Sequence, residues 1–219
     1  TLRPYQQTGL NWLWFLSELG LGACLADDMG LGKTIQVISL LLAQKGRAGK
    51  TAPSLLVLPA SLLSNWMSEL DRFAPSLAVV CPHPSAMERS ELARIAADPA
   101  RALASNDAVL TTYGMVQRQE WIGKMEWDLI VLDEAQAIKN QATKRSQAAM
   151  ALQADFRVIL SGTPLENHLG ELWNLFRFIN PGLLGSLEQF NERYAGPIER
   201  LQSAEARNRL RKLIGPFIL

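Results

Sequence analysis

The first segment with residue types suited to chemistry covers positions 27–34 and reads DDMGLGKT. Gly30 and Gly32 let the backbone fold into a nest of N–H groups that can surround phosphate oxygens. A helix that begins directly afterwards would point its positive end at the same anion. Lys33 could then reach the β and γ phosphates of a nucleotide, and the Thr34 hydroxyl could hold Mg²⁺. The GKT ending matches the Walker A pattern, although Asp27 replaces the first glycine of the general pattern.

The second such segment is a pair of adjacent acids at the end of an apolar run. Residues 128–132 read DLIVL, and Asp133 and Glu134 follow them directly. Asp133 suits water-mediated coordination of the Mg²⁺ that accompanies a nucleotide. Glu134 suits polarising the water that attacks the γ-phosphate. For each segment alone there is an alternative, namely a glycine turn with an exposed lysine, or a helix-capping aspartate beside a solvated glutamate. The occurrence of both segments in one chain favours ATP hydrolysis over these alternatives.

Both segments follow short apolar runs that read as buried strands. These runs are rich in Val, Leu and Ile with little alternation, as is typical of a parallel sheet covered on both faces. Ligands in such sheets bind outside the carboxyl ends of the strands, which is where both segments lie. The expected strands cover residues 22–27, 54–59, 77–81, 108–112, 128–133 and 157–161.

Helical stretches alternate with these strands, and strand–helix alternation predicts right-handed crossovers in a doubly wound α/β sheet with helices on both faces. Two expected helices begin with a capping box, formed by Ser85 with Glu88 and by Ser186 with Gln189. No strand is expected after Ser161. The expected helices cover residues 4–19, 34–43, 61–73, 85–97, 143–152, 166–179, 186–194 and 204–214.

The composition limits the classes of function. The chain has 219 residues, 48% of them apolar, which argues against disorder, and a formal net charge of +1. A strongly basic face, the usual sign of a nucleic-acid module, is not evident from composition, so a nucleic-acid partner must be argued from motifs. Cys24 and Cys81 lack CxxC spacing and read as reduced structural thiols. We expect no membrane span, because no apolar run reaches roughly 18 residues, and no signal peptide.

These motifs occur in an order that resembles the Swi/Snf-type DNA translocases of helicase superfamily two. Residues 27–34 resemble motif I of that family, and residues 133–140 (DEAQAIKN) resemble motif II with its tail. Residues 160–173 (LSGTPLENHLGELW) are similar to motif III and its extension, and residues 2–6 (LRPYQ) to the adenine-recognising Q motif. Residues 56–61 with Asn65 and Trp66 look like motif Ia, although we expect Trp66 itself in the core. The sequence of residues 165–169 and the Ala/Arg-rich composition of the chain resemble those of bacterial proteins.

The resemblance implies a RecA-like first lobe that binds ATP and Mg²⁺. Lys33, Glu134 and Gln136 would be the catalytic residues, and Thr34 and Asp133 would hold the metal. Gln6 would hydrogen-bond adenine with Arg3 and Tyr5 nearby. The nucleotide would contact Arg3, Tyr5, Gln6, Asp27, Asp28, Met29, Gly30, Leu31, Gly32, Lys33 and Thr34.

The resemblance also implies surfaces that face nucleic acid and a segment that couples them to the phosphate state. For the basic residues a solvated helix face is the alternative, and for the coupling segment a simple strand-ending turn. The nucleic-acid residues would be Ser61, Thr112, Tyr113, Lys139 and Asn140. The coupling residues would be Ser161, Gly162 and Thr163.

Motifs of the second lobe, with its arginine finger, do not occur in this sequence. We therefore expect residues 1–219 to be the first lobe, with a Q-motif region at 1–20 and a helical extension at 185–219 that leads to lobe two. The expected partners are double-stranded DNA, the second lobe and a DNA-bound protein substrate. The expected location is the bacterial cytoplasm at the nucleoid, or the nucleus in a eukaryote. A strand-separating helicase and a non-catalytic ATP-gated clamp are the alternatives.

Overall fold

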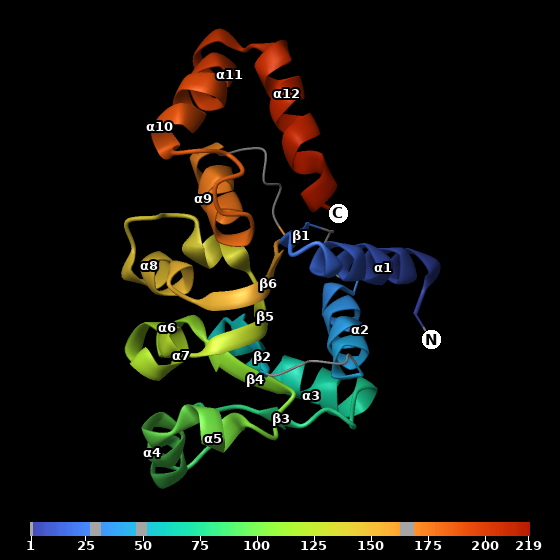
Figure 1. Cartoon of the computed structure of the whole chain (residues 1–219), viewed down its shortest axis with the longest axis vertical. Helices are drawn as coiled ribbons and strands as arrows, with labels where there is room; N and C mark the ends of the chain where they lie inside the picture. The colour runs from blue at the N-terminus through green and yellow to red at the C-terminus, as the bar shows by residue number, and fades with distance from the viewer. Residues whose placement is uncertain (1, 27–31, 47–51, 163–168) are drawn as a thin grey trace.

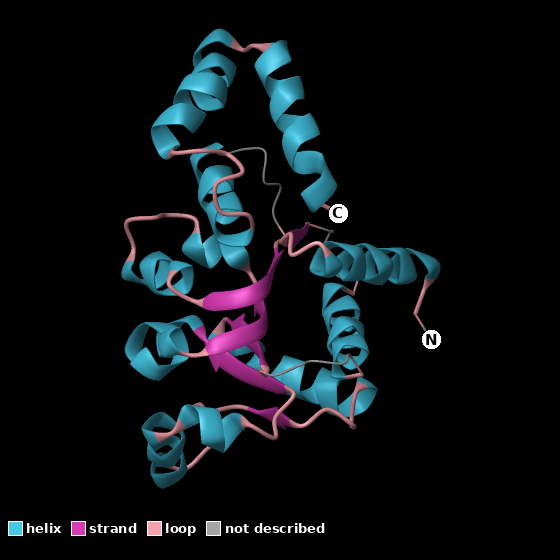
Figure 2. Ribbon diagram, viewed as in Figure 1, coloured by secondary structure: helices cyan, strands magenta, loops and turns pink. Residues whose placement is uncertain are grey.

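The computed structural model of the chain describes residues 2–26, 32–46, 52–162 and 169–219. Within these residues, parallel strands form a six-stranded sheet in the order β1-β6-β5-β2-β4-β3 (Figure 1). The order is not sequential, so helices cross over the sheet between strands, as Figure 2 shows. The strands are β1 Ala23–Leu25, β2 Ser54–Leu58, β3 Val79–Val80, β4 Ala108–Thr112, β5 Glu126–Leu132 and β6 Gln153–Leu160.

The central strands are buried because both faces of the sheet are covered. Every residue of β2 and β4 is buried, and the burial of β5 and β6 increases toward their carboxyl ends. Successive side chains point to opposite faces. Leu56 and Leu58 accordingly pack in one apolar cluster, and Leu55 and Val57 in another. The expected α/β sheet with two helical layers is confirmed.

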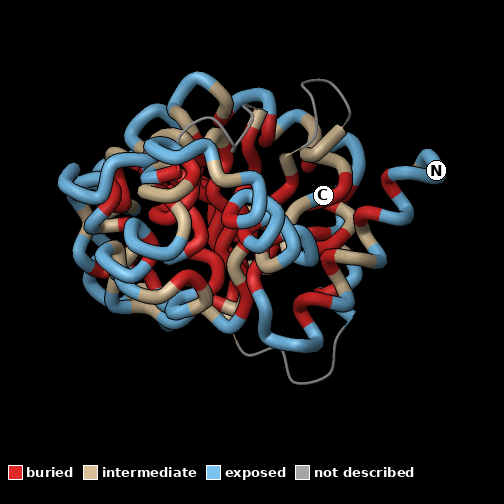
Figure 3. Tube along the Cα trace, turned by 90° about the horizontal axis from the view of Figure 1, so that it is seen from above, coloured by how far each residue is buried: buried red, intermediate tan, exposed pale blue. Residues whose placement is uncertain are grey.

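The first helical layer consists of α1 Pro4–Glu18, α2 Lys33–Lys45 and α3 Leu63–Phe73, preceded by the 3₁₀ turn η1 Ala60–Leu62. These helices lie on one side of the sheet in Figure 1. They contribute Leu13, Ile38 and Trp66 to the core, each at most 1% exposed. Figure 3, seen from above, shows this buried interior enclosed by exposed helices.

The second layer lies on the opposite face and continues into a helical projection (Figure 1). Tyr113, Ile122 and Phe176 bury their side chains there. The layer contains α6 Tyr113–Arg118, α7 Glu120–Lys124, the 3₁₀ turn η2 Ala135–Ile138, α8 Lys144–Met150 and α9 Leu169–Ile179. Helices α4 Arg89–Ala97 and α5 Pro99–Leu103 lie beyond β3. The projection contains α10 Leu187–Phe190, the π-helical turn η4 Asn191–Ala195, α11 Gly196–Leu201, α12 Ala204–Ile214 and the 3₁₀ turn η5 Gly215–Phe217.

Several expected boundaries are wrong. β6 begins at Gln153 rather than at 157, because its first three residues lie at or near the surface and carry no apolar signal. The strand expected at 77–81 is reduced to Val79–Val80. The capping box expected at Ser85 is absent, because α4 begins at Arg89 and the Ser85 hydroxyl pairs with the ring Nδ1 of His83 at 2.7 Å.

The capping box at Ser186 is confirmed. The Ser186 Oγ accepts from the Gln189 backbone N at 3.1 Å, and the Gln189 Oε1 accepts from the Ser186 backbone N at 3.0 Å. The helical run continues through η4 into α11, beyond the expected end at 194. Helices α5, α6 and α7 were not expected, because five or six residues are too few to display a helical period.

The last residues of the chain pair with β1, where no further strand was expected. Ile218 forms a parallel bridge with Cys24. The Leu219 N–H donates to the Cys24 carbonyl at 3.0 Å, and the Ala26 N–H donates to the Leu219 carbonyl at 2.7 Å. Two residues are too short a segment to be recognised as a strand from sequence. The helical projection therefore returns to the edge of the sheet, next to Ala26 directly after β1.

A close contact fixes the end of α9 against β1. The Asn180 side chain accepts from the Gly22 N–H at 2.9 Å and donates to the Gly22 carbonyl at 3.1 Å. A Cβ at Gly22 would overlap the backbone carbonyl of Ile179. Only glycine allows this approach. None of the helices in the described part of the chain is both long enough and apolar enough to cross a membrane.

Candidate active site

The carboxyl ends of β1, β6 and β5 lie side by side, because these neighbouring strands are parallel. β1 leads to the phosphate segment, β6 to Ser161 and β5 to Asp133. In open parallel sheets this edge is where ligands bind. The fold therefore brings three segments that are distant in sequence to one place.

Within the phosphate segment, the residue just before α2 is a glycine that no other residue can replace without strain. Gly32 has a φ of 79°, in the left-handed region, and a Cβ there would lie 2.5 Å from the Gln6 Nε2. α2 begins at the next residue, so half-buried Lys33 and Thr34 occupy the first turn at the positive end of the helix. The preceding residues Asp27, Asp28, Met29, Gly30 and Leu31 lie outside the described part of the chain.

Asp133 directly follows β5 and is 9% exposed. Its Oδ2 accepts a hydrogen bond of 2.8 Å from the indole Nε1 of Trp66, and its Oδ1 accepts one of 2.9 Å from the Glu134 backbone N. Burial raises the pKa of Asp133 and the Glu134 charge adds to the rise, whereas both hydrogen bonds and the Lys33 charge oppose it. The positive charge of Lys33 thus favours the charged form of Asp133.

Glu134 has a left-handed backbone, with φ 50° and ψ 55°. For a residue with a Cβ this conformation costs roughly 1–2 kcal/mol, and such residues concentrate at active sites. The half-buried Glu134 carboxylate accepts a hydrogen bond from the Gln136 side-chain amide. The turn therefore presents both side chains together at the end of β5.

Neighbouring elements hold this turn in place. The Tyr113 hydroxyl donates to the Asp133 carbonyl at 2.7 Å. At the end of η2, the Ile138 carbonyl accepts from the Ser146 hydroxyl of α8 at 3.1 Å and from the Asn174 amide of α9. We did not predict these contacts. The one sequence feature that could have indicated them is the polar residue Asn174 within the otherwise apolar buried face of α9.

Two residues expected to face nucleic acid are buried instead. Tyr113 is 4% exposed, and its hydroxyl donates to the Asp133 carbonyl. Burial raises the pKa of the Tyr113 phenol, and the Asp133 charge adds to the rise. Thr112 is 6% exposed and its hydroxyl caps α6 by accepting from the Met115 backbone N. The prediction that these side chains face nucleic acid is wrong. They support the carboxylate turn and the helix that follows β4.

The other three expected nucleic-acid residues lie on the surface. Ser61 in η1 and Asn140 after η2 are exposed. Lys139 is also exposed, and its ammonium pairs with the Glu171 carboxylate at 2.9 Å. All three side chains are accessible to an external partner, although Lys139 would have to exchange its ion pair and the Asn140 Oδ1 already accepts from the Ala142 backbone N at 2.9 Å.

The Q-motif residues divide in a similar way. Gln6 is 9% exposed, lies against Gly32, and accepts from the Arg3 backbone N at 3.0 Å. Arg3 and Tyr5 are exposed. On the coupling side, Ser161 is buried and its backbone N donates to the Leu25 carbonyl at 3.0 Å, with half-buried Gly162 next. Thr163 lies outside the described residues.

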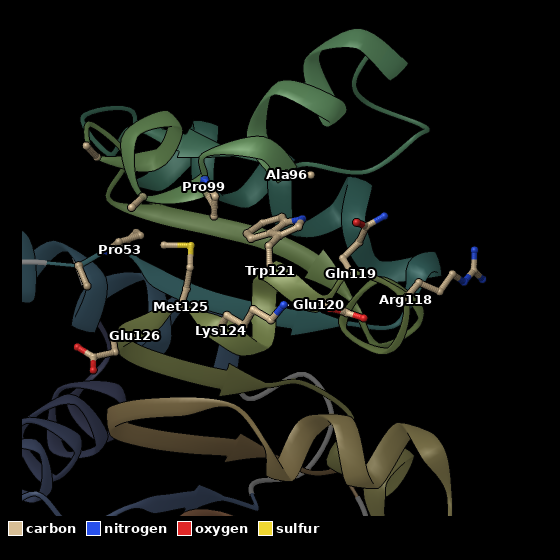
Figure 4. Close-up of a pocket in the computed structure, with 13 residues that line it drawn as sticks. Pro53, Ala96, Pro99, Arg118, Gln119, Glu120, Trp121, Lys124, Met125 and Glu126 are labelled. Carbon is tan, nitrogen blue, oxygen red and sulfur yellow. Dashed lines mark hydrogen bonds and ion pairs between the residues drawn. The ribbon is translucent and has the colours of Figure 1, made fainter.

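A separate cavity lies elsewhere on the molecule. It has a volume of about 940 Å³ and is lined by Pro53, Trp121, Met125 and Glu126 among others (Figure 4). Pro53 precedes β2 and Glu126 opens β5, so this cavity lies at the amino edge of the sheet. It therefore takes no part in the site at the carboxyl edge.

The groups at the carboxyl edge fit a nucleotide bound with a magnesium ion. Gly32 allows the backbone to pass close to the Gln6 side chain, which brings Gln6 to the start of α2. Lys33 could supply a cation for phosphate oxygens, and Thr34 and Asp133 could supply the oxygen donors that Mg²⁺ prefers. The parallel sheet, the glycine–lysine helix start and the paired carboxylates together define a P-loop nucleotide-binding domain of the RecA-like class.

Comparison with known proteins gives the family. The SNF2-related domain matches residues 5–219, and the chain belongs to that family. The Bacillus subtilis protein YwqA, which carries the provisional name of an ATP-dependent helicase/translocase, is 46% identical over all of this chain. The TATA-binding protein-associated factor MOT1 of Saccharomyces cerevisiae is 36% identical over all of it. The Bacillus relative supports the expected bacterial character.

Solved structures agree with the fold. The Sulfolobus solfataricus SWI2/SNF2 ATPase core in complex with double-stranded DNA is 41% identical and superimposes with a TM-score of 0.88 over all of this chain. A second structure, of the SWI2/SNF2 ATPase core domain from the same organism, gives a TM-score of 0.85 at 42% identity. The chain spans 44% and 43% of those two chains, 23% of YwqA and 13% of MOT1.

Proposed function

We propose that this chain is the ATP-binding lobe of a motor that hydrolyses ATP in order to move along double-stranded DNA. The observation that carries the proposal is that the start of α2, with Lys33, and the Asp133–Glu134 turn both lie at the carboxyl edge of the sheet, after β1 and β5. The similarity to a SWI2/SNF2 core solved with double-stranded DNA supports the choice of partner.

The residues divide between holding the nucleotide and breaking its terminal bond. Lys33 would contact the β and γ phosphates, helped by the positive end of α2. Thr34 and Asp133 would hold Mg²⁺, which when bound neutralises charge on the phosphates. Gln6, already placed against Gly32, would hydrogen-bond adenine, with Arg3 and Tyr5 nearby.

Glu134 would act on the water. Its carboxylate would accept a proton as the water oxygen bonds to the γ-phosphorus and the bond to the β-phosphate oxygen breaks. The Gln136 amide, which donates to this carboxylate, would orient it and respond to loss of the γ-phosphate. Ser161 and Gly162, at the end of the neighbouring β6, would pass that response to the DNA-binding surface.

A second RecA-like lobe would complete the enzyme by supplying an arginine finger. Residues 185–219 would form the helical extension that leads to it. Opening and closing of the cleft between lobes would step the protein along the duplex. Ser61, Lys139 and Asn140 are the exposed residues that would contact DNA phosphates, and such contacts carry little sequence information. A protein bound to that DNA would be the object that the motor displaces or remodels.

The test is ATP hydrolysis by the full-length protein with and without duplex DNA. We expect duplex DNA to stimulate turnover and single-stranded RNA to do so much less. Larger stimulation by single strands would instead indicate a strand-separating helicase, the activity that the provisional name of YwqA includes. Nucleotide-dependent DNA binding without any turnover would indicate a clamp.

A further inference from the structure

The indole of Trp66 has an unusual hydrogen-bond partner. Trp66 lies on α3 and is 1% exposed, so its N–H requires an acceptor inside the protein. Trp127 is equally buried, and its indole donates to the backbone carbonyl of Ile122 at 3.1 Å. Trp66 donates instead to the Asp133 carboxylate at 2.8 Å. Burial alone therefore does not explain the choice of a carboxylate.

This hydrogen bond fixes the orientation of the Asp133 side chain. The Trp66 indole holds Oδ2, and the Glu134 backbone N–H holds Oδ1. With one donor on each oxygen, the carboxylate plane cannot rotate without losing a bond. Each carboxylate oxygen can accept more than one hydrogen bond or ligand. Both oxygens therefore keep capacity for water or a metal ion.

The rigidity of the donor comes from α3. Leu63, Trp66 and Leu70 lie on one face of this helix and are all buried against the sheet. A charge-assisted hydrogen bond from a side chain held in this way is stronger than a neutral one and directional. Trp66 and Asp133 are 67 residues apart in sequence, so the contact joins α3 to the end of β5.

We propose that Trp66 is a positioning residue, whose indole N–H orients the Asp133 carboxylate toward the magnesium ion of the bound nucleotide. The inference rests on the proposed function, because it assigns Trp66 a part in the same site. Groups that orient metal-binding side chains typically contribute about 10- to 100-fold to metal affinity or activity. Trp66 would exert its effect without touching nucleotide or metal.

The test compares Trp66→Phe with Trp127→Phe in the full-length protein. Both changes keep an aromatic ring and remove one buried indole N–H, but only the first hydrogen bond reaches the site. Binding of ADP is measured by calorimetry in EDTA and across a Mg²⁺ titration, which reports metal use without turnover. We expect Trp66→Phe to raise the Mg²⁺ concentration needed for tight ADP binding about tenfold or more. Affinity in EDTA should stay within about twofold.

A second measurement requires no change at Trp66. In ¹⁵N-labelled wild-type protein, the Trp66 indole resonance should shift when Mg²⁺ is added to the ADP complex. The Trp127 resonance, assigned from Trp127→Phe, should remain in place. This arm decides the question if Trp66→Phe does not fold.

Equal Mg²⁺ dependence in the two variants, or a Trp66 indole that does not respond to Mg²⁺, would overturn the positioning role while leaving nucleotide binding intact. Wild-type protein that binds no nucleotide at all would overturn the proposed function, and this inference with it. The two failures are therefore distinguishable.

Discussion

Lys33 and Glu134 lie in one site but make different contacts with a bound nucleotide in the proposed mechanism. Lys33 would contact phosphates before and during hydrolysis, so Lys33→Ala should weaken ATP binding and abolish turnover together. Glu134 would touch only the attacking water. Glu134→Gln should therefore keep ATP and Mg²⁺ binding while slowing hydrolysis by about 10²–10⁴. Nucleotide titration and single-turnover hydrolysis in the full-length protein measure the two effects separately.

Either of two results would contradict this division. Loss of nucleotide affinity in Glu134→Gln as severe as in Lys33→Ala would mean that Glu134 helps to hold the nucleotide. Near-normal turnover of Glu134→Gln would mean that the general base is another group.

The backbone of Glu134 gives a prediction about stability. Gln202, which caps α11 far from the site in sequence, has nearly the same conformation, with φ 49° against 50° for Glu134. Glycine removes a cost of roughly 1–2 kcal/mol at such positions, offset by roughly 0.5–1 kcal/mol of extra chain entropy. Both Glu134→Gly and Gln202→Gly should therefore raise the unfolding free energy by up to about 1 kcal/mol in urea denaturation.

The two variants should differ in activity. Glu134→Gly should lose hydrolysis, whereas Gln202→Gly should keep it. A marked loss of stability in Glu134→Gly alone would show that the Gln136 contact outweighs the backbone strain.

At the residue scale, the sequence predicts those functional residues that lie together in one short segment of the chain. Lys33, Asp133 and Glu134 are predicted as site residues because a few neighbouring residues are enough to indicate the chemistry of each segment. The hydrogen bonds of Asn174 to Ile138, 36 positions away, and of Tyr113 to Asp133, 20 positions away, have no such signal. For the same reason Tyr113 was assigned to a surface that it does not reach.

At the scale of elements, whether a segment forms a helix or a strand is easier to predict than where that helix or strand begins and ends. The buried strands β2 and β4 were recognised from apolar composition, because both of their faces are covered. The sequence does not predict the start of β6, because the residues at the amino end of this strand lie at or near the surface and need no apolar side chain. α6 and α7 were missed because their helical state depends on packing against the sheet, which local sequence does not record.

The junction between α9 and β1 should tolerate no side chain at Gly22. A Cβ there would overlap the Ile179 carbonyl, so Gly22→Ala should force the backbones apart and destabilise the protein by about 2 kcal/mol or more. Gly170 lies in α9 as well, and a Cβ there meets no atom within 4 Å. Gly170→Ala should stabilise the protein by about 0.5–1 kcal/mol through helix propensity.

Chemical denaturation of both alanine variants measures this difference. A Gly22→Ala protein as stable as wild type would mean that α9 can move away from β1 at little cost, contrary to the double hydrogen bond between Asn180 and Gly22.

For the whole molecule, charge distribution matters more than net charge. The chain carries a net charge of +1, so in the proposed mechanism tight DNA binding would come from particular cations, the counterions that they release and the second lobe. Affinity of the full-length protein for duplex DNA should fall steeply as salt rises, by roughly 10³–10⁵ between 50 and 200 mM for about six to ten phosphate contacts. Titration at several salt concentrations gives the slope.

The same salt titration can test whether Lys139 contacts a DNA phosphate. Lys139→Ala should reduce the salt slope by about one. Lys45→Ala is the matched control, because Lys45 is also ion-paired, with Asp107 at 2.7 Å, at the opposite end of α2 from the site. An unchanged slope in Lys139→Ala would mean that its pairing with Glu171 persists in the DNA complex.

The pairing of Ile218 and Leu219 with β1 has a consequence for solubility. An outermost strand displays a row of backbone N–H and carbonyl groups that can recruit strands from other molecules, which is a route to aggregation. Leu219 occupies such groups on Cys24 and Ala26 at one edge of the sheet. At the other edge, β3 is only two residues long and offers a short template. The residues that hold Ala26 beside the phosphate segment therefore also protect the sheet from pairing with other copies.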